Sequence, residues 1–372
     1  MPALRVALFA LGAGLAAWSL WSAVRTMVVP RSLQSVLARA VFEGVRGVLR
    51  LLLGRNPPYE RADRVMAHFA PVSLMTLPVV CLAIVALGFA AMFWSFGSRS
   101  ARDAFELSGS SLLTLGTRSA GDLPTQLLSF VEAGMGLGLV ALLIAYLPSI
   151  YATFNRREVA VALLEVRADS PPSGPNMILR YHRIGWDGGL TQVWKDWETW
   201  FADVEESHSS LPALVFFRSP QPYRSWVTAS GAVLDGAALR ASTIEGPRDA
   251  EADLCIRAGY VALRHVADFF QIPYDPDPAP GDPISVTREE YDAVCQRLAD
   301  AGVPLKQDRD QAWLDFAGWR VTYDAALTGL AALTMAPPAP WSSDRGTPFL
   351  RPPLLHRRAR RRRDPTVAEP DG

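Results

Sequence analysis

The residue types that most often carry catalysis or bind metals are scattered along this chain of 372 residues. Its five histidines show no ligand spacing, and its three cysteines lie far apart. No Ser, His and Asp arrangement typical of a hydrolase emerges. The C-terminal part contains neither a Gly-x-Gly-x-x-Gly nor a Gly-x-x-x-x-Gly-Lys-Ser/Thr motif. We therefore expect no enzyme activity, no metal site and no bound cofactor.

A different chemistry is available in one short segment, where the backbone rather than the side chains would act. It contains Thr114, Leu115, Gly116 and Thr117, and Gly121-Asp122 follows. Gly116 tolerates a left-handed backbone, and a line of carbonyl oxygens can replace the hydration shell of a cation. A helix predicted over residues 102–113 would end at this segment, where the negative end of its dipole favours a cation.

The elements that must position this segment are apolar spans. Leu4 to Val24, Pro71 to Phe96 and Leu123 to Phe154 each approach or exceed the roughly 20 residues that cross a bilayer as a helix. The first could instead be a cleaved signal peptide, but its apolar run is too long for that and no small-x-small site follows Trp21. We expect three membrane helices, the first of them uncleaved.

The order of these features resembles the pore module of the potassium-channel superfamily. That module has an outer helix, a pore helix, a Thr-x-Gly filter strand, a Gly-Asp pair with a following Pro, and an inner helix; here the resemblance covers residues 71–154. It implies a re-entrant pore loop and a permeant monovalent cation such as K⁺. It also implies a homo-tetramer, because each chain supplies one filter segment of the four required. The ion pathway would comprise Thr114, Leu115, Gly116, Thr117, Gly121 and Asp122.

The sequence departs from the usual Thr-Val-Gly-Tyr-Gly-Asp core of that family. Thr117 replaces the Tyr, and residues 118–120 intervene before Gly121. Either Arg118 occupies the place of the second Gly, or a three-residue insertion gives that place to Gly121. Both versions predict a degenerate filter. The alternative function is therefore a non-conducting, membrane-anchored interaction or regulatory protein that retains the channel fold.

Three residues of the third span are candidates for filter support or gating. Glu132 is the only charged residue within the second and third predicted spans and should face protein or water. It could support the filter, line a cavity or lie near the outer interface. Gly134 and Gly138 form a small-x-x-x-small pair, which serves either close helix packing or a gating hinge.

Positive charge sets the expected orientation. Seven arginines lie between residues 30 and 70, whereas residues 97–122 are balanced, which predicts a cytoplasmic first loop and C-terminal part and an external filter segment. The protein is thus expected to be a multi-pass protein of the cell membrane. Residues 1–150, 151–344 and 345–372 carry net charges of +5, −10 and +5.

The predicted fold class is all-α, with membrane helices, a re-entrant loop and a helical cytoplasmic domain. The expected parts are a membrane helix (1–29), a basic amphipathic segment (30–70), the pore module (71–154), a linker (155–175), the helical domain (176–343) and a disordered Pro/Arg-rich tail (344–372). The helix expected from Ser32 to Leu53 could lie in the inner membrane interface or pack on the protein itself.

Within the domain, apolar periodicity predicts helices over residues 190–208, 226–244, 249–271, 287–301 and 310–335. Residues 211–217 could form a strand or a helix, and Thr287 with Glu290 predicts a capping box. The aromatic residues Trp194, Trp197, Trp200 and Phe201 are expected in the core.

The C-terminal tail carries a cluster of arginines: Arg357, Arg358, Arg360, Arg361, Arg362 and Arg363. Such a cluster could bind anionic lipid or the acidic domain, or stay solvated. Because the chain is expected to be anchored in a membrane, lipid or self-association is favoured over nucleic acid, which is not expected as a partner.

Overall fold

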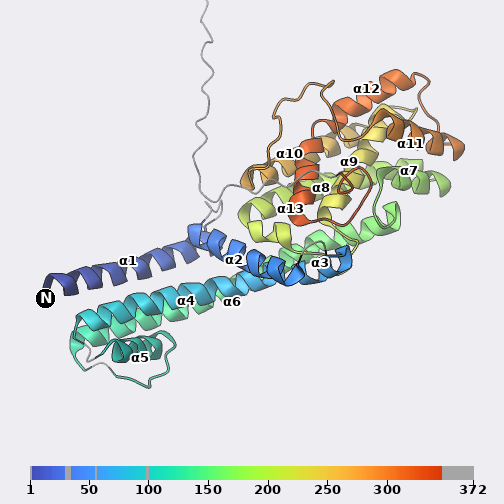
Figure 1. Ribbon diagram of the computed structural model, residues 1–372. Helices are drawn as coiled ribbons and strands as arrows, with labels where there is room; N and C mark the ends of the chain where they lie inside the picture. Colours follow the sequence, from blue (N-terminus) through green and yellow to red (C-terminus); the bar gives the residue numbers. More distant parts are fainter. Residues whose placement is uncertain (1, 30–34, 55–56, 98–99, 120, 346–372) are drawn as a thin grey trace, which may run out of the picture.

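A computed structural model describes residues 2–29, 35–54, 57–97, 100–119 and 121–345. The described chain is mainly helical, as predicted, and its only strand-like pairing is an isolated bridge between Ile244 and Leu305. Figure 1 shows long helices extending from one side of a globular helical domain. The arginine cluster at 357–363 and the start of the predicted amphipathic helix at residues 32–34 lie outside the described residues.

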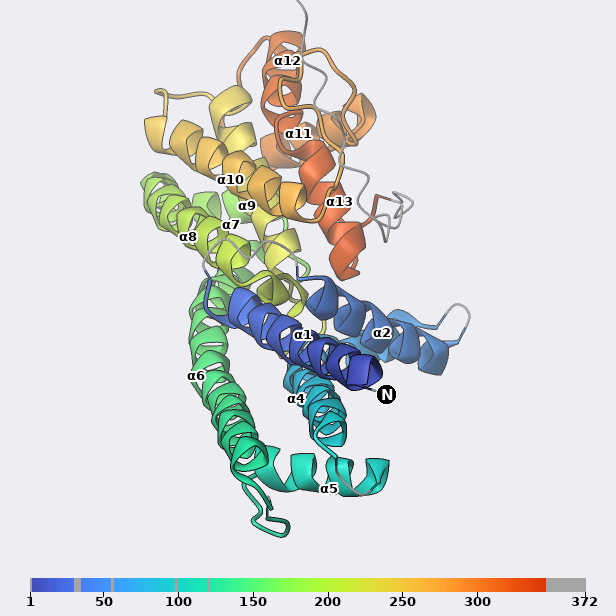
Figure 2. The ribbon, with the colours of Figure 1, turned by 90° about the vertical axis from the view of Figure 1, so that its left-hand side faces the viewer.

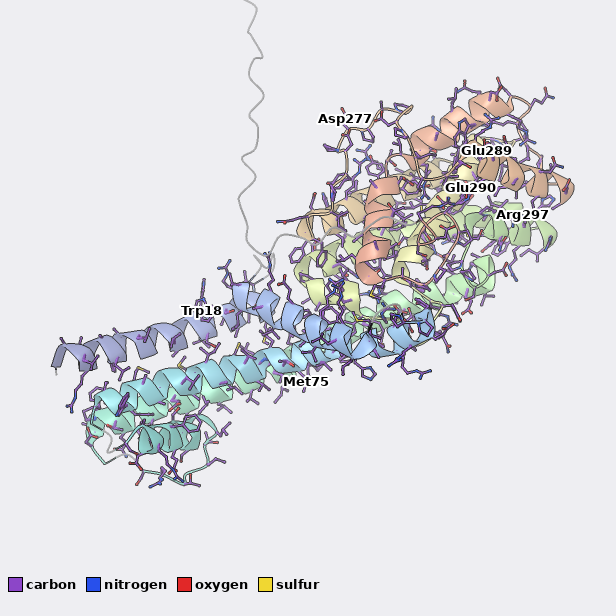
Figure 3. All side chains as sticks on the ribbon, in the orientation of Figure 1. Trp18, Met75, Asp277, Glu289, Glu290 and Arg297 are labelled. Carbon is purple, nitrogen blue, oxygen red and sulfur yellow. The ribbon has the colours of Figure 1, made fainter. Side chains whose placement is uncertain are left out.

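Among the described residues, three helices are long and apolar enough to cross a membrane: α1 (Pro2–Met27), α4 (Phe69–Ser95) and α6 (Leu123–Ala168). Their surfaces differ in kind from that of the domain. Trp18 and Met75 project from α1 and α4 and are 45% and 51% exposed, whereas the labelled side chains of the domain are charged (Figure 3).

Close backbone packing joins α1 to α4. A Cβ atom on Gly12 would lie 2.3 Å from the carbonyl oxygen of Gly88, so only glycine permits this approach. Farther along the same contact, the buried hydroxyl of Ser19 donates a 3.0 Å hydrogen bond to the carbonyl of Cys81. Small residues and interhelical hydrogen bonds are the usual means by which membrane helices associate.

Two shorter helices, α2 (Val36–Leu53) and α3 (Tyr59–Met66), lie where the long helices meet the domain (Figure 1). Ser35 caps α2, because its hydroxyl accepts a hydrogen bond from the backbone of Ala38. Leu37 and Val41 are buried, whereas Leu51 and Leu52 are 84% and 65% exposed. The helix therefore packs on the protein with one side and presents an apolar side to the exterior.

The domain consists of α7 (Gly174–Arg183), η1 (Asp187–Gly189), α8 (Leu190–Ser210), η2 (Pro212–Phe216), α9 (Trp226–Ser242), α10 (Ala250–Phe269), α11 (Arg288–Asp300), α12 (Arg309–Arg320) and α13 (Asp324–Thr334). The central helix α9 is buried along almost its whole length. The four aromatic residues Trp194, Trp197, Trp200 and Phe201 are buried in the core, as predicted.

Local predictions in the domain had mixed outcomes. The capping box at Thr287 and Glu290 is confirmed, and residues 212–216 form a 3₁₀ helix rather than a strand. The single helix expected over residues 310–335 was wrong, because a turn separates α12 from α13. The turn lets both Arg320 and Tyr323 reach Asp235 on α9, at 2.5 and 2.9 Å.

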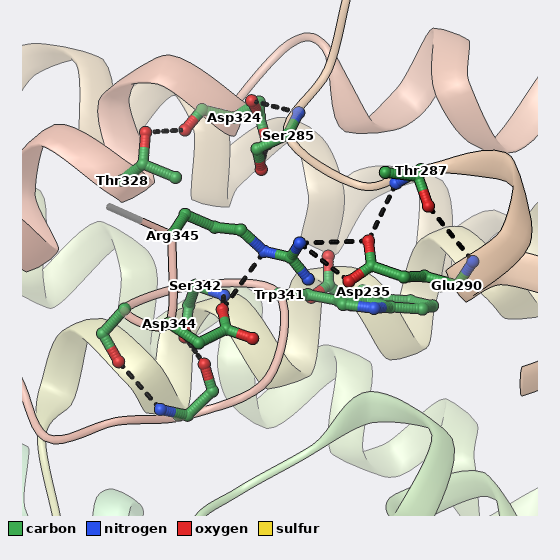
Figure 4. A network of polar contacts seen from close by, with 12 residues as sticks. Asp235, Ser285, Thr287, Glu290, Asp324, Thr328, Trp341, Ser342, Asp344 and Arg345 are labelled. Atoms are coloured by element: carbon green, nitrogen blue, oxygen red, sulfur yellow. Dashed lines mark hydrogen bonds and ion pairs between the residues drawn. The ribbon is translucent and has the colours of Figure 1, made fainter. Parts of the chain in front are cut away.

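Polar contacts fix the last described segment to the domain. The buried guanidinium of Arg320 also donates to the backbone carbonyl of Trp341, which anchors the chain after α13. In Figure 4, Arg345 pairs with Glu290 at 2.8 Å, and Ser285 contacts Asp324. Arg345, which we expected in a disordered tail, therefore makes ordered contacts.

The junction between α6 and the domain is continuous helix. Residues 155–168, which we assigned to a linker, extend α6. Val161, Leu164 and Ala168 are buried in the hydrophobic core of the domain. The end of α6 is therefore structurally part of the domain.

Candidate functional site

The segment between α4 and α6 contains a short helix, α5 (Ala101–Leu112), at the end of the long helices remote from the domain (Figure 2). It begins at Ser100, whose hydroxyl accepts a 3.1 Å hydrogen bond from the backbone of Asp103. Its apolar residues Ala104, Leu107 and Leu112 are buried in one cluster with residues of α4 and α6. The helix predicted over residues 102–113 is thus confirmed to within one residue.

Ser108 of α5 contacts both α4 and α6 at the same depth along these two helices. Its hydroxyl lies 2.9 Å from the carbonyl oxygen of Ala86 on α4 and contacts the carboxyl group of Glu132 on α6. Ala86 lies nine residues before the end of α4, and Glu132 nine residues after the start of α6. At 1.5 Å per residue, both place Ser108 about 14 Å below the ends of these helices. Glu132 is fully buried, and its second carboxyl oxygen has no partner among the described residues.

The C-terminal end of α5 lies deeper still. A Cβ atom on Gly136 would lie 2.2 Å from the carbonyl oxygen of Leu112, so these backbones touch. Gly136 follows the start of α6 by 13 residues, or about 20 Å of helix. No atom of the described chain lies within 4 Å of a Cβ at Gly134 or Gly138, so the close helix contact within one chain is made at Gly136, and the roles expected for Gly134 and Gly138 stay predictions.

The filter-like residues begin as the C-terminal cap of α5. The amide of Leu115 donates to the carbonyl of Ser110 at 2.8 Å, and that of Thr114 to Ser111 at 3.0 Å. This is a Schellman motif, with Thr114 at the left-handed position usually taken by glycine. Thr114 has φ = 53° and Gly116 has φ = 68°. A left-handed Gly116 agrees with the prediction, whereas a β-branched residue at positive φ was not expected.

The chain then returns along α5. The hydroxyl of Ser110 accepts a 3.0 Å hydrogen bond from the backbone of Arg118, and the Arg118 guanidinium pairs with Glu106. Glu106 also binds Arg102 at 2.8 Å, so one carboxyl group pairs with two arginines. Neither Arg118 nor Gly121 has a positive φ. Neither therefore reproduces the left-handed backbone expected at a second filter glycine.

The remaining predicted ion-pathway residues are exposed in the single chain. Residues 113–119 and Gly121, Asp122 and Leu123 are accessible, and the carbonyl oxygens of residues 114–117 accept no hydrogen bond from the described residues. Asp122 occupies the cap position of α6 without using its side chain. Unpaired carbonyl oxygens next to the C-terminal end of a helix form a surface suited to a cation.

Sequence reasoning missed three residues of this site: Ser108, Glu106 and Gly136. Their signal was weak, since Ser108 lies in a run of small polar residues and Glu106 in an ordinary charged turn. Only the packing of α5 between α4 and α6 shows that Ser108 faces Glu132. Within the described part of the chain, no group of three or more His, Cys, Asp or Glu side chains could hold a metal ion.

Comparisons with protein-family models, with curated proteins and with solved structures gave no match to this chain.

Proposed function

We propose that this protein is a pore-loop membrane protein whose α4, α5 and α6 assemble as a tetramer and pass monovalent cations such as K⁺ through a degenerate filter. The position of α5 carries the proposal. Its carboxyl end lies about 20 Å along α6, in contact with Gly136, so the chain enters between two membrane-length helices and turns back. An ordinary external loop has no reason to reach this depth.

Orientation is supported by the arrangement of the helices. The arginine-rich segment with α2 and α3 lies at the same end of the long helices as the acidic domain, and α5 lies at the other end (Figure 1). The positive-inside rule then places the domain in the cytoplasm and the α5 loop outside. In this topology α1 is a further span that packs on α4. The exposed side of α6 is then available for contact with neighbouring chains.

A homo-tetramer is supported by an unpartnered stripe on α6. Leu127, Phe130, Leu137 and Ile144 are 54% to 67% exposed, and they recur at the helical repeat. Gly134 lies in the same stripe and is exposed with open space around it. A stripe with large apolar residues and a small residue suits a helix of a second copy.

The test is cation flux into proteoliposomes that contain the purified full-length protein, with K⁺ and Na⁺ compared. Gly116→Ala should abolish flux, because the left-handed backbone resists a side chain although the space around it is open. Gly109→Ala is the matched control, since Gly109 is helical and equally open, and it should retain flux. A correctly assembled wild type without flux at varied voltage, pH and lipid composition would contradict conduction.

One observation favours the second candidate, a non-conducting membrane-anchored interaction protein. Arg118 is held beside the filter-like segment by Glu106, and a second left-handed residue is absent at both Arg118 and Gly121. A cation fixed at this place opposes cation entry. If Arg118→Gly creates K⁺-selective flux that the wild type lacks, the fold is a pore closed by Arg118. If neither form conducts, the scaffold function is the better account.

A further inference from the structure

A cavity of about 190 Å³ lies where α2, α4 and α6 meet the domain, and it is partly open to the surface. The long helices contribute Phe69, Leu74 and Tyr146 to its wall. The domain contributes Ala213 and Phe216 from η2, together with Phe270 after α10 and Leu333 of α13. The cavity is thus walled by both halves of the molecule.

Its lining is apolar on most sides and charged on one. Arg39, Glu43 and Arg46 line it from α2, at spacings that place them on one helical face beside Phe42. This face carries one net positive charge. Within the described ranges, no carboxylate pairs with the Arg39 guanidinium.

The location of the cavity indicates the source of a bound molecule. This inference rests on the proposed placement of the protein in the membrane. The cavity lies at the cytoplasmic end of the spans, beside a helix that exposes Val48, Leu51 and Leu52. Those side chains suit immersion at the boundary between lipid headgroups and acyl chains. Anionic headgroups of the inner leaflet would meet Arg39 and Arg46 at this level.

We propose that the cavity binds one acyl chain of an anionic phospholipid, with the phosphate at Arg39 and Arg46. An apolar cavity of about 150 Å³ accommodates a molecule of the size of benzene, so this volume takes a segment of one chain and not of two. Because α2, the spans and the domain all contribute walls, a bound lipid would join the cytoplasmic domain to the membrane helices.

The experiment uses the purified full-length protein in detergent, measured by native mass spectrometry and by thermal unfolding. Phosphatidylglycerol, phosphatidylcholine and palmitate are titrated separately. Wild type should retain one phosphatidylglycerol per chain and unfold at a higher temperature with it. Ala38→Trp, which fills the cavity, should lose the retained lipid. Ala40→Trp is the matched control, because Ala40 lies on the exposed side of α2.

Arg39→Gln keeps the proposal testable if Ala38→Trp does not fold. It should weaken phosphatidylglycerol binding about tenfold and phosphatidylcholine binding less, because the cationic choline leaves that headgroup with no net charge. Equal retention by wild type and Ala38→Trp, or equal binding of both phospholipids, would overturn the proposal. Binding of palmitate in place of phospholipid would overturn it as well. Failure of the protein to stay in carbonate-washed membranes would instead refute the membrane placement, and ion flux is not needed for any of these readouts.

Discussion

The hydroxyl group of Ser108 on α5 contacts the carboxyl group of Glu132 on α6, 24 residues away along the chain. The same hydroxyl lies within hydrogen-bond distance of the carbonyl of Ala86 on α4. A hydroxyl has one proton to donate, and both of these partners are acceptors when the carboxyl group is ionised. A neutral carboxyl group would donate its proton to the oxygen of Ser108. The hydroxyl proton of Ser108 could then be donated to the carbonyl oxygen of Ala86.

This relationship predicts different effects of two substitutions. Glu132→Gln should keep thermal stability close to wild type, because the amide can donate to Ser108 in the same way. Glu132→Ala should destabilise by about 1–3 kcal/mol, since it removes that donor and leaves a cavity. Thermal unfolding in detergent measures both. Equal losses in the two variants would argue against the neutral, donating carboxyl group.

The glycines of α6 should differ sharply in sensitivity. Gly136→Ala places a Cβ against the Leu112 carbonyl, and it should displace α5 and lower stability by about 1–3 kcal/mol. Gly134→Ala and Gly138→Ala meet no atom in the single chain and should leave its unfolding unchanged. Cross-linking measures how much oligomer forms. Gly134→Ala and Gly138→Ala should reduce the amount of oligomer only if the exposed stripe of α6 is an interface between chains. A mild Gly136→Ala with a harmful Gly134→Ala would contradict the observed packing.

His208 connects the end of α8 to α6, and we expect it to make the domain sensitive to acid. It is buried, its Nε2 accepts a 3.1 Å hydrogen bond from Arg157, and its Nδ1 lies 3.0 Å from the Ser207 hydroxyl. Burial, with the nearby Arg157 charge, holds the pKa of His208 well below its usual value. Both hydrogen bonds are satisfied by the neutral ring.

The unfolded chain should therefore take up a proton at His208 below about pH 6.5 that the folded chain does not. Stability is then complete above pH 6.5 and falls as the pH drops, by up to about 1.4 kcal/mol per unit until the folded pKa is reached. His208→Gln can make both hydrogen bonds without titrating and should flatten this dependence. Parallel stability curves for the two proteins between pH 7 and pH 5 would refute the assignment.

The contribution of α6 to the domain core predicts where the domain can be cut. A fragment of residues 155–345 should give a helical circular dichroism spectrum and melt cooperatively. A fragment of residues 169–345 lacks Val161 and Leu164, whose burial contributes about 1.5–3 kcal/mol each, and should melt earlier. Identical melting curves would show that the end of α6 is dispensable.

The sequence by itself determined the elements whose signal is local. Continuous apolar runs predicted α1, α4 and α6, and the pairing of Thr287 with Glu290 predicted the start of α11. Gly116 was expected to adopt a left-handed backbone because its lack of a side chain makes that conformation accessible. These features depend on the residue and its close neighbours in the chain.

Only the tertiary structure decided which distant residues meet. The sequence pointed to Gly134 and Gly138, but the rotation of α6 turns Gly136 toward Leu112 and leaves the other two outside. Helical periodicity could not predict the break between α12 and α13, at which Arg320 and Tyr323 both contact Asp235 on α9. The sequence likewise did not identify the partner of Glu132, which depends on how α5 packs against α6. Contacts across helices depend on rotation and depth, which a one-dimensional pattern does not encode.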